Sequence, residues 1–475
     1  DATALMSPAL AEICGTPAAP DGWDNDCDTF IDEGCGAAEC GDGYCEPGEC
    51  ACASDCAAVP FDCNVAGDGI GADTTETEQC ASSADQTYPT VANAANEDVI
   101  CVHPAAGCID AFCDVPCEAT IAAALVRVAA LLQPLAKPTY VWIYNSGAAP
   151  DYAERVNINN ATIVPTAANR LWVGGRCVAG ARDAVTVSYG PPAVPPCAAP
   201  CTAGADTIVT IDRPYVTLEG LTIDTNIETT IAGVGLSTAA GVATGNADYA
   251  ILRKLTVTSG ALEADVGTGT SNSYVRVAGG SLNFLTDVLI DRVEIMPPQS
   301  PLETETLSYG LYANYHQNLT VRRSAVCDLN TSTATAISLA NNQVQGLLDR
   351  VLVRDIVGTT TTSGVGISQG SAGNAYVLTL DGVVAKNNWT YGAWITGRSP
   401  TIRNSRFVDN SVGLWLSQTS ATIPLSADVL NNHFDNNAKV IATPTVPTGV
   451  GLKATVAPAG AGTLAFTRLA FNTFS

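Results

Sequence analysis

The chain has 475 residues, of which 47% are apolar and only 15% are charged. This composition excludes an intrinsically disordered chain, and the excess of 47 acidic over 22 basic residues argues against nucleic acid as a partner. The charge is also unevenly placed, because residues 1–118 hold 24 acidic side chains and no Lys or Arg. Residues 119–475 are close to neutral, so two physically different regions are joined.

Residues 1–37 contain an acidic loop in which carboxylates recur at alternate positions from Asp24 onward. Ca²⁺ is a hard cation that takes about 6–8 oxygen ligands, and closely spaced aspartates supply several of them. The alternative is a solvated acidic loop, but no basic residue lies nearby to neutralise the carboxylates. We therefore predict a calcium-loop module here.

This loop resembles the calcium repeats of thrombospondin type 3 modules, dockerins and related secreted proteins. The resemblance implies side-chain oxygens from three alternating aspartates, one backbone carbonyl and a final carboxylate. The metal ligands expected on this basis are Asp24, Asp26, Asp28, Phe30, Asp32 and Glu33.

Residues 38–118 form an acidic, Cys-rich region. A second and less regular group of carboxylates in it is a further candidate metal site, made of Asp42, Glu46, Glu49 and Asp55. Whether an ion binds there or the carboxylates are merely solvated stays open at the level of sequence.

The cysteines indicate a disulfide framework, because 14 of the 18 lie in the acidic region, where large apolar residues are few. Structural zinc is the alternative, but CxxC pairs with histidine partners at matched spacing are missing. Cys327 stands apart, and we expect a buried thiol in the core there rather than a nucleophile. The disulfide candidates are Cys14, Cys27, Cys35, Cys40, Cys45, Cys50, Cys52, Cys56, Cys63, Cys80, Cys101, Cys108, Cys113, Cys117, Cys177, Cys197 and Cys201.

Disulfides persist in oxidising compartments, so the cysteine content predicts a secreted or cell-surface protein. The chain begins at Asp1 without a basic or apolar leader, which we interpret as a processed, mature form. The most apolar run, Ile121–Ala136, contains Arg127 and is too short to span a bilayer. We therefore expect no membrane span.

From about Thr207 onward, short β-branched runs recur with a mean period of about 31 residues, which predicts stacked repeats. Glycine-led strands lie between these runs, and asparagines suited to left-handed corners separate them. A β-sandwich is the alternative, but it requires hairpin dipeptides that are scarce here. The recurring runs are Val216–Ile223, Ala250–Val257, Val288–Ile295, Leu319–Val326, Leu347–Val353, Leu378–Val384, Thr401–Val408 and Leu464–Phe471, with a weaker copy at His433.

Residues 119–475 resemble right-handed parallel β-helix proteins of the pectin-lyase-like superfamily. The resemblance is strongest at Pro400–Asn410 and Val412–Leu416, and it is also clear at Thr139–Ile143, Tyr152–Ile158 and Leu171–Gly175. It implies an all-β fold, a right-handed parallel β-helix or solenoid, capped by an amphipathic helix at 119–133. The disulfide-rich acidic region would precede this β-helix.

Catalytic residues are harder to identify. Arg398 and Arg403 match the R-x-P-x-x-R pattern of pectate lyases, in which an arginine acts as base beside calcium-binding acids. We interpret the match as an ordinary strand opening, since Asp381 and Asp409 stand singly and form no acidic cluster. These two arginines are therefore weak candidates, and we favour a protein that is not an enzyme.

Two functions fit these observations. The first is a secreted, calcium-binding structural or adhesive surface protein that self-associates end to end into extracellular filaments, because a strand directly precedes Ser475 and leaves an uncovered edge. The alternative is a secreted polysaccharide lyase or hydrolase acting on the long flank of the β-helix. Carbohydrate is a candidate partner for either, whereas nucleic acid is not.

Overall fold

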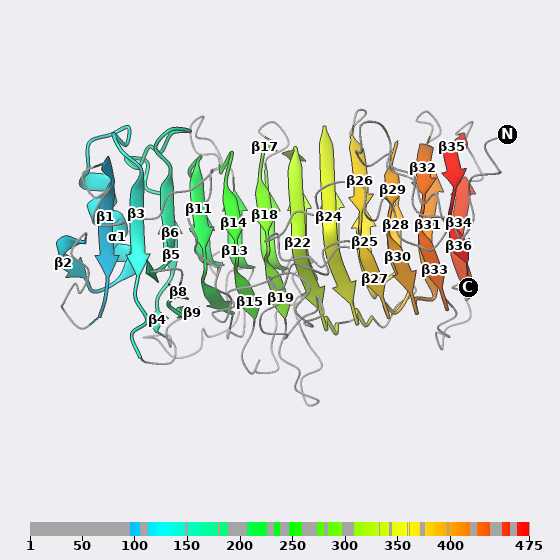
Figure 1. The fold of residues 1–475 in the computed structure, drawn as a ribbon, viewed down its shortest axis with the longest axis horizontal. Helices are drawn as coiled ribbons and strands as arrows, with labels where there is room; N and C mark the ends of the chain where they lie inside the picture. The colour runs from blue at the N-terminus through cyan, green and yellow to red at the C-terminus, as the bar shows by residue number, and fades with distance from the viewer. Residues whose placement is uncertain are drawn as a thin grey trace, which may run out of the picture.

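The computed structural model describes residues 96–104, 113–147, 151–178, 181–188, 207–225, 232–237, 247–258, 273–279, 284–296 and, with internal gaps, 308–474. The described chain is mostly parallel β-sheet with a single short helix among the described residues, which confirms the prediction of an all-β protein. Figure 1 shows the strands lying side by side along an elongated molecule, with helix α1 at one end and strands β34–β36 at the other.

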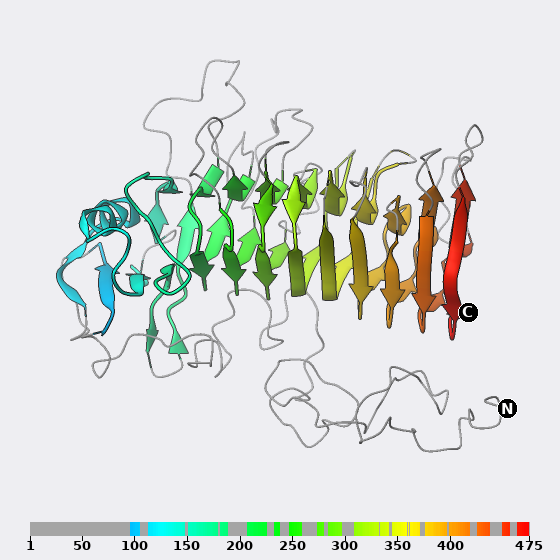
Figure 2. The same ribbon diagram turned by 90° about the horizontal axis from the view of Figure 1, so that it is seen from above.

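The strands form three columns, because each one pairs in parallel with its equivalent in the next repeat. Columns A and B together make the 22-stranded sheet, and column C is the 10-stranded sheet (Figure 2). Column A contains β1 (Asp98–Val102), β3 (Thr139–Ile143), β6 (Leu171–Gly175), β11 (Val216–Glu219), β14 (Ile251–Arg253), β18 (Leu289–Asp291), β22 (Leu319–Cys327), β24 (Gln345–Arg354), β26 (Val377–Asp381), β29 (Thr401–Arg403), β32 (Leu425–Leu430) and β35 (Leu464–Ala470).

Column B follows column A in each repeat, and the long strands β22 and β24 belong to both columns. Its separate strands are β4 (Tyr152–Ala153), β9 (Thr186–Ser188), β12 (Thr222–Asp224), β15 (Thr256–Thr258), β19 (Glu294–Met296), β27 (Val384–Lys386), β30 (Arg406–Val408), β33 (His433–Asp435) and β36 (Thr473–Phe474). Strand β2 (Asp114–Glu118) pairs with β1 at the edge of the sheet, so this sheet includes strands that precede residue 119.

Column C consists of strands most of which have glycine as their second residue. They are β5 (Val156–Ile158), β10 (Thr207–Ile211), β13 (Ala232–Ser237), β16 (Ser273–Ala278), β20 (Tyr309–Asn314), β23 (Thr335–Ala340), β25 (Val365–Gln369), β28 (Tyr391–Ile395), β31 (Val412–Gln418) and β34 (Val450–Val456). Two small pairs complete the described strands: antiparallel β7 (Cys177–Val178) with β8 (Ala181–Arg182), and parallel β17 (Leu285–Thr286) with β21 (His316–Gln317).

Helix α1 (Ile121–Ala130) lies against β1, β3 and β5 and is shorter than the expected helix over 119–133. Thr120 is its N-cap, and the Oγ1 atom of that residue accepts the N–H of Ala123 at 3.0 Å. The Glu154 carboxylate accepts the N–H groups of Ile121 and Ala122 at 2.7 and 3.0 Å, where a negative charge is favourable. Its buried face packs on the first strands through Ile121, Ala124, Leu125 and Val128.

Seven of the eight recurring sequence runs contain a residue with positive φ, and the eighth, Leu464–Phe471, ends on one. Gly220 separates β11 from β12, and Asn404 separates β29 from β30. The equivalent corners are 22 residues apart between Gly382 and Asn404 but 40 apart between Asn431 and Phe471. The repeat therefore has the expected mean length, while the loops between strands vary widely.

The interior is filled by stacked side chains and by a polar ladder. The rings of Phe407, Phe434 and Phe474 stack with centroid distances of 5.2 and 4.9 Å. Beside them, the buried side-chain oxygen of Asn410 accepts the backbone N–H of Asn388 at 3.0 Å. These inward contacts repeat from strand to strand, so neighbouring repeats are held in register by side chains as well as by the backbone.

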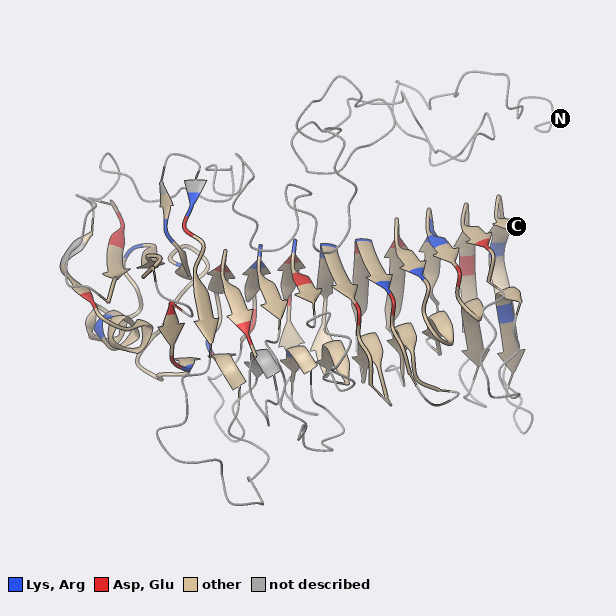
Figure 3. Ribbon diagram, turned by 90° about the horizontal axis from the view of Figure 1, so that it is seen from below, with Lys and Arg blue, Asp and Glu red and all other residues tan. Residues whose placement is uncertain are grey.

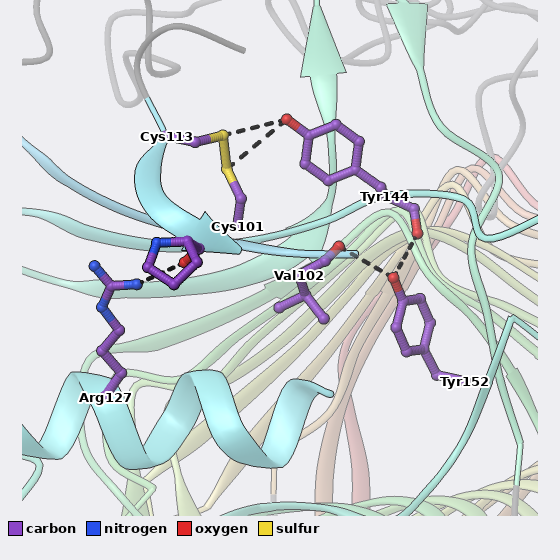
Figure 4. Close-up of a disulfide and its surroundings, with 7 residues drawn as sticks. Cys101, Val102, Cys113, Arg127, Tyr144 and Tyr152 are labelled. Atoms are coloured by element: carbon purple, nitrogen blue, oxygen red, sulfur yellow. Dashed lines mark hydrogen bonds between the residues drawn. A yellow bond between two sulfur atoms is a disulfide. The ribbon is translucent and has the colours of Figure 1, made fainter. Parts of the chain in front are cut away.

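The disulfide between Cys101 and Cys113 ties β1 to the segment before β2. Figure 4 shows Tyr144 pointing at both sulfurs, at 3.2 Å from the Cys113 Sγ and 3.8 Å from the Cys101 Sγ. The Tyr152 hydroxyl donates to the backbone carbonyls of Val102 and Tyr144, as the same view shows. This end of the sheet is thus held by covalent and polar links together.

The structure corrects the prediction for Cys327, which is disulfide-bonded rather than a free thiol. Its side chain is fully buried, as expected. Cys117 and Cys177 are also disulfide-bonded, in agreement with their place among the candidates. The cysteine count could have predicted this bond. The 17 predicted disulfide cysteines are an odd number, so at least one of them needs Cys327 or another partner. Among the predicted disulfide cysteines, Cys14, Cys27, Cys35, Cys40, Cys45, Cys50, Cys52, Cys56, Cys63, Cys80, Cys108, Cys197 and Cys201 lie outside the described residues.

Glu97 lies directly before β1 and is only 9% exposed. Burial raises the pKa of this carboxyl from 4.5 to about 6. Because the folded state holds the proton more tightly than the unfolded state, stability should fall as the pH rises through that interval and stay lower above it. We expect Glu97→Gln to remove this part of the pH dependence, which melting curves between pH 4 and 8 would measure. A variant with the same pH profile as the wild type would contradict the assignment to Glu97.

Candidate functional site

The outer side of column A carries a ladder of charged residues, one from each of several neighbouring strands. Figure 3 shows acidic and basic segments recurring along the length of the molecule. Because the strands are in parallel register, each of these residues is the neighbour of the next. In order along the column, the ladder is Glu219, Arg253, Asp291, Arg322, Asp349, Asp381 and Arg403.

Asp291 is the centre of the ladder and is almost completely buried. Its carboxylate lies 3.0 Å from Arg322 Nε, 3.4 Å from Arg253 Nε and 3.4 Å from Arg323 Nη2. Burial alone would raise the pKa of Asp291, but Arg323, Arg322 and Arg253 together hold it below its ordinary value. The residue is therefore a permanent anion that links three repeats, and not a group that exchanges protons near neutral pH.

The first rung of the ladder is a buried ion pair. Arg182 Nη2 lies 2.7 Å from the Glu219 carboxylate, and the two side chains are 2% and 5% exposed. The arginine extends from the β7–β8 hairpin across Gly220, whose φ is +64°. A Cβ at residue 220 would lie 2.0 Å from Arg182 Nη1, so both the conformation and the space require glycine there.

The structure describes one of the two weak catalytic candidates, Arg403, and leaves Arg398 outside the described residues. Arg403 donates through Nε and Nη2 to one oxygen of Asp381, at 2.9 and 2.6 Å. Asp381 is thus not a single acid, as the sequence suggested, because it lies beside Arg403 on one side and Asp349 on the other. Its ion pair neutralises the arginine, which is poorly suited to act as a base in this state.

The predicted calcium ligands all lie outside the described residues. This holds for Asp24, Asp26, Asp28, Phe30, Asp32 and Glu33, and equally for the second group of Asp42, Glu46, Glu49 and Asp55. Within the part of the chain that the structure describes, no group of three or more His, Cys, Asp or Glu residues is placed to hold a metal ion. No helix in that part is long and apolar enough to cross a membrane.

Column C presents a different surface on its outer side. The five consecutive strands β20, β23, β25, β28 and β31 contain no charged residue. One outward position runs along them through Tyr312, Ser338, Ser368, Trp394 and Trp415 and ends at Lys453 in β34. We call this row of residues the aromatic strip.

At one end of the aromatic strip, three successive side chains of the row stack on one another. The Trp394 and Trp415 rings are 4.9 Å apart and nearly parallel, at an angle of 10°. The Lys453 ammonium lies 4.2 Å from the centroid of Trp415, and partial burial lowers the pKa of this lysine. Trp415 Nε1 donates to Thr455 at 2.9 Å. Both tryptophans are partly exposed, so this rigid aromatic surface is accessible from outside.

The other end of the strip combines aromatic rings with small polar side chains. Tyr309 and Tyr312 of β20 have ring centroids 5.1 Å apart. The next two positions after Tyr312 are the serines 338 and 368, and the tryptophan at 394 follows. Sequence reasoning missed this surface, although Tyr391–Ile395 and Val412–Leu416 each carry a tryptophan two residues after a glycine.

Comparisons of the chain with protein-family models, with curated proteins and with solved structures found no match.

Proposed function

We propose that this protein is a structural or adhesive component of an extracellular surface, and that the aromatic strip is where its rod contacts a partner. The aromatic strip on the uncharged strands β20, β23, β25, β28 and β31 carries the proposal. The same outward row continues to Arg276 in β16 and to Lys453 in β34. Exposed, rigid aromatic surfaces favour binding at low entropic cost.

We infer that the three strand columns are the faces of a right-handed parallel β-helix. The regular succession of A, B and C strands, with parallel pairing of equivalents, supports this architecture. Helix α1 would be the cap of the first coil, a role that fits its contacts with β1, β3 and β5. The disulfide between Cys101 and Cys113 supports a disulfide-rich region before this β-helix and a location outside the cell.

Self-association end to end is part of the same proposal. In the last described repeat, Leu469 is 51% exposed and Phe474 is 58% exposed, whereas their equivalents in earlier repeats are buried. Sedimentation at increasing concentration should reveal assemblies that Leu469→Lys weakens. A wild-type chain that stays monomeric at high concentration would exclude end-to-end self-association. The proposed contact role of the aromatic strip would not be affected.

The same proposal includes calcium binding by the acidic loop at Asp24–Glu33. We expect EDTA to lower the melting temperature of the acidic N-terminal region, because an ion that binds only the folded state stabilises it by mass action. The strands of columns A to C, β1 included, should melt unchanged when followed by circular dichroism. Hydrogen exchange in residues 1–95 would follow the acidic region separately. An identical exchange pattern with and without EDTA would exclude the calcium role.

A polysaccharide lyase or hydrolase is the second candidate, and the observation that favours it is that two carboxylates, Asp349 and Asp381, are register neighbours on column A beside Arg403. Incubation with a panel of polysaccharides, followed by detection of new reducing ends, tests this function. Activity that disappears in Arg403→Lys would establish it. If the wild type cleaves none of the polysaccharides, the enzymatic function is excluded and the structural or adhesive function is retained.

The adhesive role is tested by retention of the purified chain on insoluble glycans and on bacterial or other cell surfaces. Trp415→Ala removes a central ring of the strip, and retention should fall at least tenfold. Arg403→Ala is the matched control on column A, where no loss is expected. Equal retention of the two variants would contradict the assignment of the contact surface.

A further inference from the structure

We infer that the acidic, Cys-rich segment 1–95 docks on the outer side of column B at strands β22 and β24, where a disulfide to Cys327 holds it. The receiving surface consists of Ala325, Cys327 and Leu352, with Met296 and Val384 packed at its edges. We call these five residues the column B patch.

The column B patch lies on the side of its strands that faces away from the core. Successive side chains of a strand point to opposite sides, and Val326 and Val353 belong to the main core. Ala325, Cys327 and Leu352 occupy the alternate positions and form a separate cluster. They are nevertheless only 0%, 0% and 4% exposed. Burial on the outer side of a sheet indicates a covering segment.

The disulfide of Cys327 indicates which part of the chain provides the cover. Cys327 is disulfide-bonded, and the one disulfide between two described residues joins Cys101 to Cys113. The partner of Cys327 therefore lies outside the described residues. Distance agrees with this, because Cys117 and Cys177 lie at the first strands, at least four strand spacings or about 19 Å from β22. The Cα atoms of a disulfide lie within about 7 Å of each other.

Chain length narrows the choice of partner. Ten of the cysteines outside the described residues belong to segment 1–95, and the others are Cys108, Cys197 and Cys201. Strand β22 is six strand spacings from β1, or about 29 Å. Cys108 follows the end of β1 by six residues, which span at most about 20 Å. Cys80 precedes the described chain by 16 residues, which can span roughly 50 Å, so segment 1–95 reaches Cys327 easily.

Charge favours segment 1–95 over segment 189–206, which carries Cys197 and Cys201. Two exposed bases follow the column B patch in register, Lys386 in line with Cys327 and Arg406 in line with Leu352. Neither forms an ion pair with another residue that the structure describes. Segment 1–95 has 19 acidic side chains and no Lys or Arg, whereas segment 189–206 has a single acid. The acidic segment is therefore the electrostatic complement of this surface.

The other charges near the column B patch already have partners. Arg354, in line with Cys327, pairs with Asp328 and Asp355. Glu294 lies before the patch and accepts a hydrogen bond from the threonine of β15 that lies 3.4 Å away. Asp435, further along the same column, lies 4.0 Å from the ring of the adjacent histidine. The charge left without an ion pair beside the patch is thus positive.

Disulfide mapping of the full-length chain tests the covalent link. Residues 1–126 contain no Lys or Arg, so trypsin leaves the whole acidic region in one peptide that ends at Arg127. Without reduction, the tryptic peptide 324–350 with Cys327 should be recovered joined to peptide 1–127, and reduction should release it. A second cleavage at acidic residues should place the linked cysteine before residue 96. A free Cys327 thiol would overturn the proposal, as would a bond to Cys108, Cys197, Cys201 or a second copy of the chain.

Carbodiimide cross-linking tests the docking itself, because this reagent joins an ammonium directly to a neighbouring carboxylate. Lys386 lies on column B beside the patch, and Lys453 on column C is the built-in comparison. Cross-links to segment 1–95 should form on Lys386 roughly tenfold more often than on Lys453, since docking raises the local concentration of carboxylates. Equal yields at the two lysines would overturn the docking, even if the disulfide were found.

A charge reversal provides the matched comparison. Arg406→Glu places a negative charge beside Lys386 on column B and should lower the cross-link yield at Lys386 roughly threefold. Arg403→Glu makes the same change on column A, where it should leave the yield as in the wild type. Both arginines are exposed, so neither change disturbs the core. Equal effects of the two variants would contradict docking on column B.

Discussion

Replacing Glu219 by glutamine should lower the free energy of unfolding by about 3–5 kcal/mol. The carboxylate is the 2.7 Å partner of Arg182, and the two side chains are only 2% and 5% exposed. Glutamine keeps the shape but removes the negative charge, which leaves the guanidinium buried beside a neutral amide. Because moving an unbalanced charge out of water is costly, the loss exceeds that of an ordinary hydrogen bond. Chemical denaturation followed by circular dichroism would measure it.

Asp381→Asn is the matched control for Glu219→Gln. It also removes a carboxylate from an arginine pair on column A, but the Arg403 side chain is 51% exposed. Water and salt screen such a pair, so the expected loss is below about 1 kcal/mol. Equal losses in the two variants would contradict the role of burial. Replacing Arg182 and Glu219 together by apolar residues should restore most of the stability, because neither charge is then left behind.

The repeats were predictable from sequence because parallel stacking imposes a pattern on every strand. The runs of β-branched residues identified column A and the start of column B, and Thr139–Ile143 and Leu171–Gly175 match β3 and β6 in full. The corners were only partly predictable. Asparagine was expected at left-handed positions, yet Tyr215 and Lys254 occupy equivalent ones with φ of 56° and 48°. Stacking overrides the local preference, which costs roughly 1–2 kcal/mol per residue.

The pairing of charges could not be predicted for a different reason. Asp381 and Arg403 are adjacent because β26 and β29 are in register, and that register depends on how much chain each loop takes up. Loops of variable length hide which residues in successive repeats are equivalent. The arginine motif at 398–403 was therefore visible as a pattern, whereas the acid that neutralises Arg403 was not.

The aromatic strip left a weak signal in the sequence. Trp394 and Trp415 each follow a glycine by two residues, which is the same place in consecutive repeats. Since parallel strands align equivalent positions, two tryptophans at one frame position predict stacking. Ser338 and Ser368 carry no comparable signal, because serine at an outward position is ordinary.

Asn410→Ala is the second change that should be strongly destabilising, by about 3–5 kcal/mol. The side chain is fully buried, and its Oδ1 accepts the backbone N–H and the Nδ2 group of Asn388 at 3.0 and 2.9 Å. Its Nδ2 donates to the Ala385 carbonyl and to Asn437 Oδ1, at 2.9 and 3.1 Å. Alanine would leave these partners buried without hydrogen bonds, and each such group costs about 1–3 kcal/mol.

The control for Asn410→Ala is Asn436→Gly, which removes an exposed amide from a corner where φ is 45°. Glycine adopts that conformation readily, so the expected loss is below about 1 kcal/mol. Denaturant titrations of both variants should separate them clearly. If Asn410→Ala cost no more than Asn436→Gly, the buried ladder would be replaceable by water, and the repeats would owe their register to backbone pairing alone. A large difference would mean that the inner amides fix how successive repeats align, and hence how the rings of the aromatic strip come to lie over one another.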